Sequence, residues 1–158
     1  MNLKAFEKVK NQIGFCGIWC GSCVVGNGLL RELTKRYEEI IKGYGLKKWA
    51  PKDFDFEEFE KGLSSIQNIA LCPGCLKDGG RENCEIRACA TEKNIAECIE
   101  CRRPADCKNL ELLNKMRTGS RQAGLMVKTE NVGQEKIIKK WIDDMKNKFP
   151  YFILFLKD

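Results

Sequence analysis

Residues 72–107 decide the fold of this chain and read CPGCLKDGGRENCEIRACATEKNIAECIECRRPADC. This stretch holds seven of the ten cysteines in a chain of 158 residues that has no histidine. The other three cysteines lie in FCGIWCGSC, which spans residues 15–23. Thiols separated by two or three residues suit a metal ion with tetrahedral thiolate ligands. We therefore interpret all ten as candidate metal ligands: Cys16, Cys20, Cys23, Cys72, Cys75, Cys84, Cys89, Cys98, Cys101 and Cys107.

The metal that these cysteines favour is Zn²⁺, because a closed site of four thiolates is typical of structural zinc. Iron–sulfur clusters are the alternative, since thiolates bind iron and zinc alike. Structural zinc contributes about 10 kcal/mol or more to the apparent folding free energy of small zinc peptides. The few apolar residues of 72–107 supply less than that. The sequence therefore predicts a mostly α, small helical domain with a cysteine-rich segment that metal stabilises.

The spacing of the cysteine pairs suggests how the ligands are grouped. Two CxxC pairs, at 72–75 and 98–101, are separated by 22 residues. Pro73 and Gly74 favour a tight turn inside the first pair. A spacer of about this length between two CxxC pairs is typical of a zinc ribbon, so one hypothesis places both pairs in one site. A second site would then combine one cysteine of 15–23 with Cys84, Cys89 and Cys107, and other partitions are open.

Apolar residues at steps of three and four predict three longer amphipathic helices, at about 24–44, 55–70 and 134–149. Asp55 would cap the second helix, and Pro150 would end the third. The residues expected to face the core are Leu30, Leu33, Tyr37, Ile40, Tyr44, Phe56, Phe59, Leu63, Ile66, Ala70, Ile137, Ile138, Trp141, Ile142, Met145 and Phe149.

Shorter helices are expected at about 84–95 and 106–117. Residues 119–133 are expected to form a long connection. A chain of this length normally has one core, so we expect a single domain over residues 1–158. Its cysteine-rich core would span about 13–112.

The sequence predicts no membrane span, because no run of about 18 uncharged apolar residues is present. Residues 1–10 lack the apolar stretch of a secretory signal, so a cytoplasmic location is expected. Thiols in the cytosol stay reduced, which favours metal chemistry over a disulfide framework.

The formal net charge of the chain is +6. Two sites of four thiolates and one Zn²⁺ each would carry −4 and reduce that charge to about +2. Residues 102–121 are locally basic, with Arg102, Arg103, Lys108, Lys115, Arg117 and Arg121 against Asp106 and Glu111, which gives +6 − 2 = +4. We interpret this stretch as a solvated face beside a metal centre. The alternative is a surface for a nucleic-acid or protein partner.

Enzymatic function has little support in the sequence. Without histidine, a catalytic triad or a histidine base is impossible, and no Walker or dinucleotide-binding loop is present. The pair Cys72 and Cys75 would suit a redox dithiol, and Cys16-x3-Cys20-x2-Cys23 has the spacing of radical S-adenosylmethionine enzymes. The expected βαβ setting and α/β barrel are both missing. We therefore expect a binding or interaction module, with an iron–sulfur redox protein or a thiol-dependent enzyme as alternatives.

The first cluster reads Phe15-Cys16-Gly17-Ile18-Trp19-Cys20-Gly21-Ser22-Cys23. It resembles the Cys-Gly-x-x-Cys-Gly-x-Cys signature of a prokaryotic cysteine-rich family known only as a domain of unknown function. The later order Cys72-Pro73-Gly74-Cys75, Cys84-Glu85-Ile86-Arg87-Ala88-Cys89-Ala90 and Cys98-Ile99-Glu100-Cys101 is similar to the second half of that family. The family pattern tends to carry a Phe-Pro-Cys ending shortly after the last CxxC pair. This chain instead has Arg102-Arg103-Pro104-Ala105-Asp106-Cys107, which is longer and lacks the aromatic residue. The resemblance covers about 13–112 and implies zinc sites, but no reaction or substrate.

Overall fold

The computed structural model describes residues 3–156, and its regular structure is helical. The α-helices are α1 (Lys4–Val9), α2 (Leu29–Tyr44), α3 (Phe56–Gln67), α4 (Glu85–Glu92), α5 (Leu110–Gln122) and α6 (Gln134–Lys146). The short 3-10 helices are η1 (Cys20–Ser22), η2 (Leu46–Lys48), η3 (Cys75–Lys77), η4 (Cys98–Glu100) and η5 (Tyr151–Phe155). Within residues 3–156, strand pairing is limited to the isolated bridges Ile13–Trp19 and Ile18–Val127. The prediction of a mostly α fold is confirmed.

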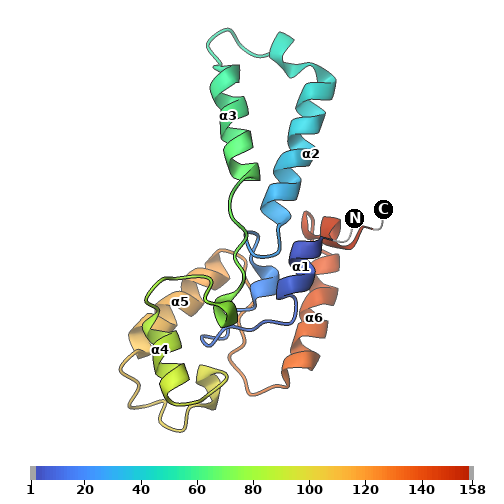
Figure 1. Ribbon diagram of the computed structural model, residues 1–158. Coiled ribbons are helices and arrows are strands. Elements are labelled where there is room, and N and C mark those ends of the chain that lie inside the picture. Colours follow the sequence, from blue (N-terminus) through green and yellow to red (C-terminus); the bar gives the residue numbers. More distant parts are fainter. Residues whose placement is uncertain (1–2, 157–158) are drawn as a thin grey trace.

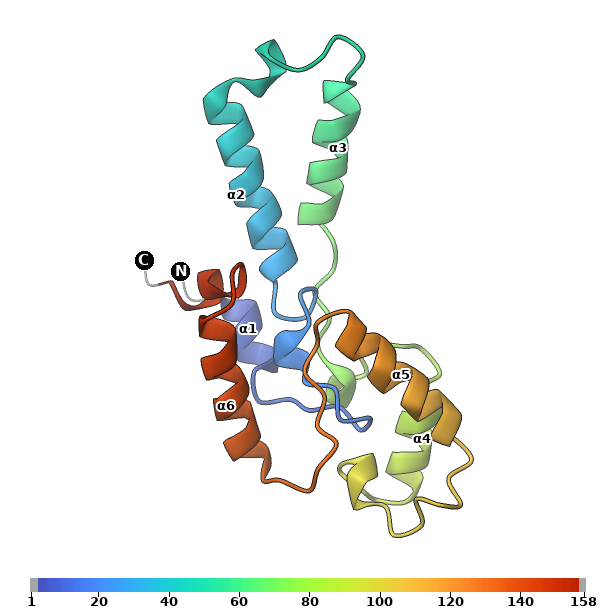
Figure 2. The ribbon, with the colours of Figure 1, turned by 180° about the vertical axis from the view of Figure 1, so that it is seen from behind.

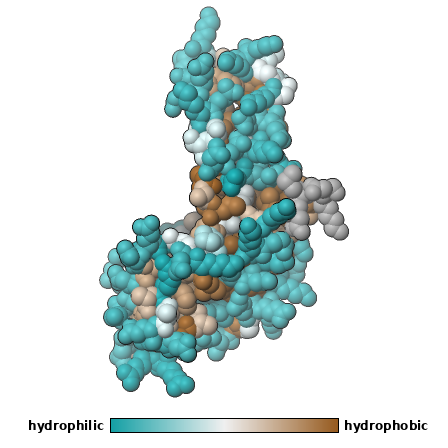
Figure 3. Space-filling model, viewed as in Figure 1, coloured by the Kyte–Doolittle hydropathy of each residue, from teal (hydrophilic) through white to brown (hydrophobic). Residues whose placement is uncertain are grey.

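Helices α2 and α3 form a hairpin, here the arm, which projects from the rest of the molecule (Figures 1 and 2). Asp55 caps α3 as predicted, because its Oδ1 accepts a hydrogen bond from the Glu58 backbone N–H at 2.9 Å. The two helices pack through a small core of Ile41, Phe56 and Leu63. On the side of the molecule that Figure 3 shows, the arm is mostly hydrophilic, while hydrophobic residues gather where the arm meets the body.

The buried face of α2 differs from the predicted one. Ile40 and Tyr44 are 67% and 76% exposed, whereas the neighbouring Ile41 is buried. The reason is that the outer part of α2 packs mainly against α3, so only a narrow line of its side chains is covered. Ala70, which was expected to face the core, lies exposed beyond the end of α3.

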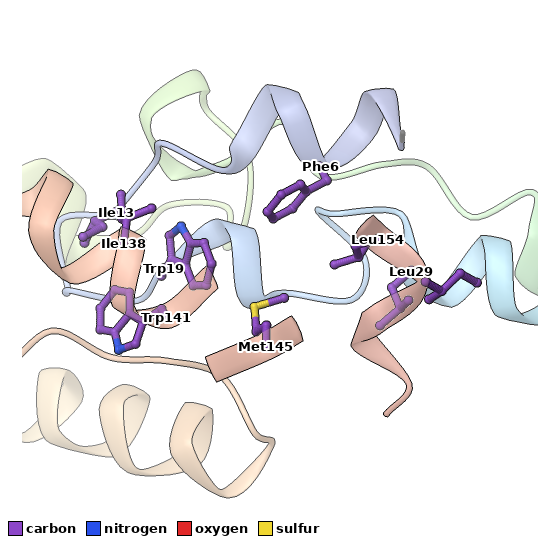
Figure 4. Packing of buried hydrophobic residues seen from close by; sticks show 9 residues of the cluster. Phe6, Ile13, Trp19, Leu29, Ile138, Trp141, Met145 and Leu154 are labelled. Carbon is purple, nitrogen blue, oxygen red and sulfur yellow. The ribbon is translucent and has the colours of Figure 1, made fainter. Parts of the chain in front are cut away.

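The main hydrophobic core lies between α1, α6, η5 and the chain around Trp19 (Figure 4). Trp19 is fully buried and stacks on Trp141 of α6, with ring centroids 5.5 Å apart. The indole Nε1 of Trp19 donates a hydrogen bond to the Lys10 carbonyl at 2.6 Å, which satisfies its one polar group. Because Trp19 lies between Cys16 and Cys20 in the sequence, its burial in this core anchors the first cysteine cluster.

Several helix bounds differ from the predicted ones. Helix α6 ends at Lys146, earlier than the predicted end near 149, and Phe149 is 80% exposed. Helix α5 begins only at Leu110, because turns around Cys107 occupy the preceding residues. Helix α1 has no counterpart among the predicted elements. No helix within residues 3–156 is long and apolar enough to span a lipid bilayer.

Candidate metal centre

Six cysteines from three separate segments line one cavity of about 150 Å³. The segments are the loop 15–23, the turn 72–75 and the start of α4. Cys16 and Cys84 are buried and pack in the same apolar cluster as Ile86. We call this group the six-cysteine set: Cys16, Cys20, Cys23, Cys72, Cys75 and Cys84.

The remaining four cysteines line a second cavity, of about 190 Å³, between α4, α5 and η4. The Cys98 backbone N–H donates a hydrogen bond to the Phe15 carbonyl at 2.8 Å, which joins this region to the loop 15–23. We call this group the four-cysteine set: Cys89, Cys98, Cys101 and Cys107.

The predicted grouping of the two CxxC pairs is wrong, because the pairs 72–75 and 98–101 line different cavities. Helix α4 separates them. Cys84 is the N-cap of α4 and Cys89 lies in its second turn. Five residues along a helix turn by about 140° around the axis, so these two thiols point in different directions. The spacing of five residues between Cys84 and Cys89 therefore indicates that they belong to different groups of cysteines. The zinc-ribbon hypothesis did not take this spacing into account.

Two glycines shape the loop 15–23. Gly17 has a φ of +91°, and a Cβ there would overlap the carbonyl oxygen of Lys128. A Cβ at Gly21 would lie 2.5 Å from the ring of Trp19. Side chains larger than glycine therefore cannot be accommodated at either position without a shift of the loop.

Residues 125–128 hold the same loop from the other side. The Trp19 backbone N–H donates to the Met126 carbonyl at 2.9 Å, and the Lys128 backbone N–H donates to the Gly17 carbonyl at 2.8 Å. This segment, which the sequence predicts to be a plain connection, therefore positions the first three cysteines.

The turn 72–75 is held by Gly74 and by an arginine. Gly74 has a φ of +95°, and its carbonyl accepts a hydrogen bond from the Gly79 N–H at 2.9 Å. Arg87 of α4 donates through Nη1 to the Gly79 carbonyl at 3.0 Å and through Nη2 to the Arg81 carbonyl at 3.1 Å. The guanidinium thus fastens the loop that follows the turn onto α4.

Burial raises the pKa of several thiols. It raises the pKa of Cys20 to about 11, and the charges of Cys75 and Cys72 add to the effect. Burial also raises the pKa values of Cys16 and Cys75, again with help from neighbouring thiols. In the four-cysteine set, burial raises the pKa of Cys98 to about 11. These thiols are therefore protonated at neutral pH unless a cation lies among them.

Two arginines favour the charged form of the thiols. Arg87 lowers the pKa of Cys75, and Arg117 lowers that of Cys98, although burial outweighs both effects. Arg117 also donates through Nε to the Cys16 carbonyl at 2.9 Å. The sequence analysis interprets Arg117 as part of a solvated face. In the structure it contacts the backbone of Cys16 and also lines the cavity of the four-cysteine set. Sequence reasoning missed this role for both arginines.

The rest of the basic stretch 102–121 has varied surroundings. Lys115 pairs with Glu111 on the surface of α5 at 2.8 Å. Arg102 and Arg103 are exposed and line an open hollow beside the four-cysteine set. The six basic residues therefore do not all serve one external face.

The donor atoms of both sets fit a thiolate-bound metal by their chemistry. All ten cysteines are free thiols. Within residues 3–156, no group of three or more Cys, Asp or Glu side chains stands in an arrangement that could hold an ion. Sulfur ligands nevertheless select zinc or iron–sulfur clusters over hard cations. A cation would also offset the repulsion that opposes ionisation of neighbouring thiols.

The model of a family described as "Protein of unknown function (DUF3795)" matches residues 12–112. No curated protein and no solved structure gives a significant match. The matched residues make up more than half of the chain and include all ten cysteines. By this match the chain belongs to the DUF3795 family.

Proposed function

We propose that this chain is a metal-binding protein whose cysteine thiolates hold structural Zn²⁺, and that it acts as a binding or interaction module. The observation that supports the proposal is the gathering of cysteines from distant segments around two cavities. Neither cavity takes part in the main hydrophobic core. Closed thiolate sites leave no coordination position for a substrate, which favours a structural role over a catalytic one.

The weak packing of the cysteine-rich half also supports a structural role for metal. Its buried cluster contains only Cys16, Cys84, Ile86 and Leu113, and two of these are themselves candidate ligands. Bound structural zinc contributes about 10 kcal/mol or more of apparent folding free energy in small domains. Part of the proposal is a reducing compartment such as the cytoplasm, in which the thiols stay available.

The test is elemental analysis of protein purified under reducing, anaerobic conditions. The proposal expects colourless protein that contains zinc, and reduced zinc content in Cys89→Ser. The matched control is Ala88→Ser, which places the same side chain at the adjacent, exposed position of α4. Metal-free protein would overturn the proposal. Brown protein with iron and acid-labile sulfide would favour the alternative of an iron–sulfur redox protein.

The third candidate, a thiol-dependent enzyme, is less well supported. A reactive cysteine needs a low pKa, whereas burial raises the pKa values of Cys16, Cys20, Cys75 and Cys98. A partner for the proposed module, protein or nucleic acid, would meet the exposed Arg102 and Arg103. Binding to nucleic acid that weakens as salt rises would identify that class.

A further inference from the structure

We propose that the arm is a dimerisation element, whose outer half packs against the arm of a second copy of this chain to form a symmetric four-helix bundle. The inference goes beyond the proposed function, because no cysteine lies in α2, in α3 or in the loop between them. It stands whether or not the thiols hold metal.

An apolar stripe on α2 that lacks a partner is the first argument. The sequence pattern predicts a buried stripe that runs from Leu33 through Tyr37 and Ile40 to Tyr44. Leu33 packs against the main core, whereas Tyr37 is 52% exposed and the exposure rises to 67% at Ile40 and 76% at Tyr44. Within residues 3–156, α3 is the one helix that runs beside the outer half of α2 (Figures 1 and 2). The stripe therefore has a covered inner end and a bare outer end.

The exposed apolar surface continues from α2 to α3. The ring of Tyr37 meets the ring of Phe59 edge-on, with centroids 6.4 Å apart, and Phe59 lies 5.3 Å from Phe54. Phe54 is 43% exposed. Because a buried aromatic side chain covers about 150–250 Å², Tyr37, Ile40, Tyr44 and Phe54 together leave roughly 400 Å² of apolar surface in water.

This area is close to what a dimer needs. A standard interface buries about 800 Å² per partner, of which a little over half is apolar. The arm alone is a hairpin with a small core, and two such hairpins complete a four-helix bundle in which each helix has two neighbours. A second arm would thus cover the bare part of the stripe.

The charges at the free end of the arm favour a second copy over other partners. Residues 42–52, here the basic block, contain four lysines and no acidic residue. Residues 53–60, here the acidic block, contain five acidic residues and no basic one. Both blocks lie at the free end of the arm (Figure 1). Two arms side by side about a two-fold axis would place the basic block of each copy against the acidic block of the other.

The acidic block argues against a polyanionic partner. Five carboxylates beside the exposed aromatic side chains would repel an anionic lipid surface or a nucleic acid. A second copy offers both signs of charge, so neither block meets its own sign.

The first test is sedimentation equilibrium of the full chain, with a reductant that prevents disulfide-linked dimers. We expect a monomer–dimer equilibrium that weakens as salt rises. The double variant Ile40→Gln with Tyr44→Gln should raise the Kd at least about 30-fold, because it removes two anchors of the interface. Both side chains are exposed in the monomer, so circular dichroism should show an unchanged fold. The matched control is Lys35→Gln at an exposed position on the opposite side of α2, which should leave the Kd unchanged.

The second test reverses the sign of each block. One variant changes three lysines of the basic block to glutamate, and the other changes three acidic residues of the acidic block to lysine. Each variant alone should be monomeric, since like charges then meet at both contacts, and an equal mixture of the two should form a heterodimer. Recovery in the mixture would also show that both variants are folded. The changes are Lys47→Glu, Lys48→Glu and Lys52→Glu in the first variant, and Asp53→Lys, Glu57→Lys and Glu58→Lys in the second.

Three outcomes would overturn the inference. The first is a chain that stays monomeric at every concentration. The second is a dimer that the Ile40 and Tyr44 changes leave intact, because it would use another face. The third is a monomer that sediments with vesicles of phosphatidylcholine and phosphatidylserine, which would assign the arm to a lipid surface. None of them affects the proposed function, since zinc content is measured in the same way on a monomer.

Discussion

Glu97 and Lys128 form a buried ion pair that connects the two cysteine sets. The Lys128 Nζ lies 2.8 Å from each carboxylate oxygen of Glu97 and donates a hydrogen bond to Oε1. The side chain of Lys128 is only 4% exposed and that of Glu97 only 7%. Glu97 directly precedes Cys98. The backbone N–H of Lys128 donates a hydrogen bond to the carbonyl of Gly17, the residue after Cys16. The pair therefore fixes the distance between the loops that carry the two sets.

Removal of one member of this pair is expected to destabilise the protein strongly. Lys128→Met leaves a buried carboxylate without a partner, which lowers the free energy of unfolding by about 3–5 kcal/mol. The double variant Glu97→Leu with Lys128→Met should recover most of that loss, because it leaves no unpaired charge. Urea unfolding measures both. Lys115→Met, which breaks the exposed pair with Glu111, is the control and should have a much smaller effect. Similar effects of the two lysine changes would contradict the prediction.

The two glycines of the first loop should not tolerate a methyl group. Gly17→Ala and Gly21→Ala each force a shift against Lys128 or Trp19, and we expect each to lower the free energy of unfolding by about 1–3 kcal/mol. Gly62→Ala is the matched control, since Gly62 lies in α3 with no atom near its missing Cβ. Alanine is the better helix former, so this control should stabilise the protein by up to about 1 kcal/mol. Urea unfolding of the three variants tests the difference in sign.

Periodicity was sufficient to predict most helices but not the faces that they bury. Steps of three and four located α2, α3 and α6, because each has an apolar side. The exposure of Ile40, however, depends on the arm's standing apart from the body, which is a tertiary property. A local pattern contains no information on how many neighbours a helix has.

The cysteine spacing was sufficient to find candidate ligands but not to group them. The zinc-ribbon hypothesis failed because it treated 76–97 as a spacer, whereas α4 lies within it and directs Cys84 and Cys89 to different cavities. The supporting contact from Arg117 to the Cys16 carbonyl joins residues 101 positions apart. The local sequence around Arg117 does not predict such a contact, because an arginine exposed to solvent could stand in the same sequence pattern.

Loss of the hydrogen bonds from Arg87 to the Gly79 and Arg81 carbonyls, here the Arg87 clamp, is expected to weaken metal binding by the six-cysteine set. Arg87→Lys keeps the charge but cannot reach both the Gly79 and Arg81 carbonyls from two nitrogens. Changes in groups that support metal ligands typically lower metal affinity by about 10–100-fold. Competition with a chromophoric chelator measures that affinity. Arg36→Lys, on the arm, removes a hydrogen bond to Glu32 and should leave the affinity unchanged. Equal affinities in both variants would show that the clamp does not matter.

Metal affinity is expected to fall as pH falls, because each thiol must lose its proton to bind. Burial raises the pKa values of Cys20 and Cys98 from the ordinary 9.0 to about 11. At about pH 8 both thiols are therefore protonated in the metal-free chain, and binding releases about one proton from each. For these two ligands, affinity should keep rising up to about pH 11 instead of levelling near 9. Calorimetric titration in two buffers of different ionisation enthalpy measures the released protons. A release near zero would contradict the prediction.

Removal of metal is expected to loosen one half of the molecule and spare the other. Helix α4 buries only Ile86 and Ala90, whereas α6 packs Trp141 and Met145 into the main core. After treatment with a chelator under reducing conditions, hydrogen exchange at the α4 amides should speed up by more than about tenfold. Exchange at the α6 amides should stay close to that of the loaded protein, because the Trp19–Trp141 stack needs no metal. Equal acceleration in both helices would mean that metal supports the whole fold. Unchanged exchange in α4 would mean that metal supports neither half, and the structural role of the thiolates would then be wrong.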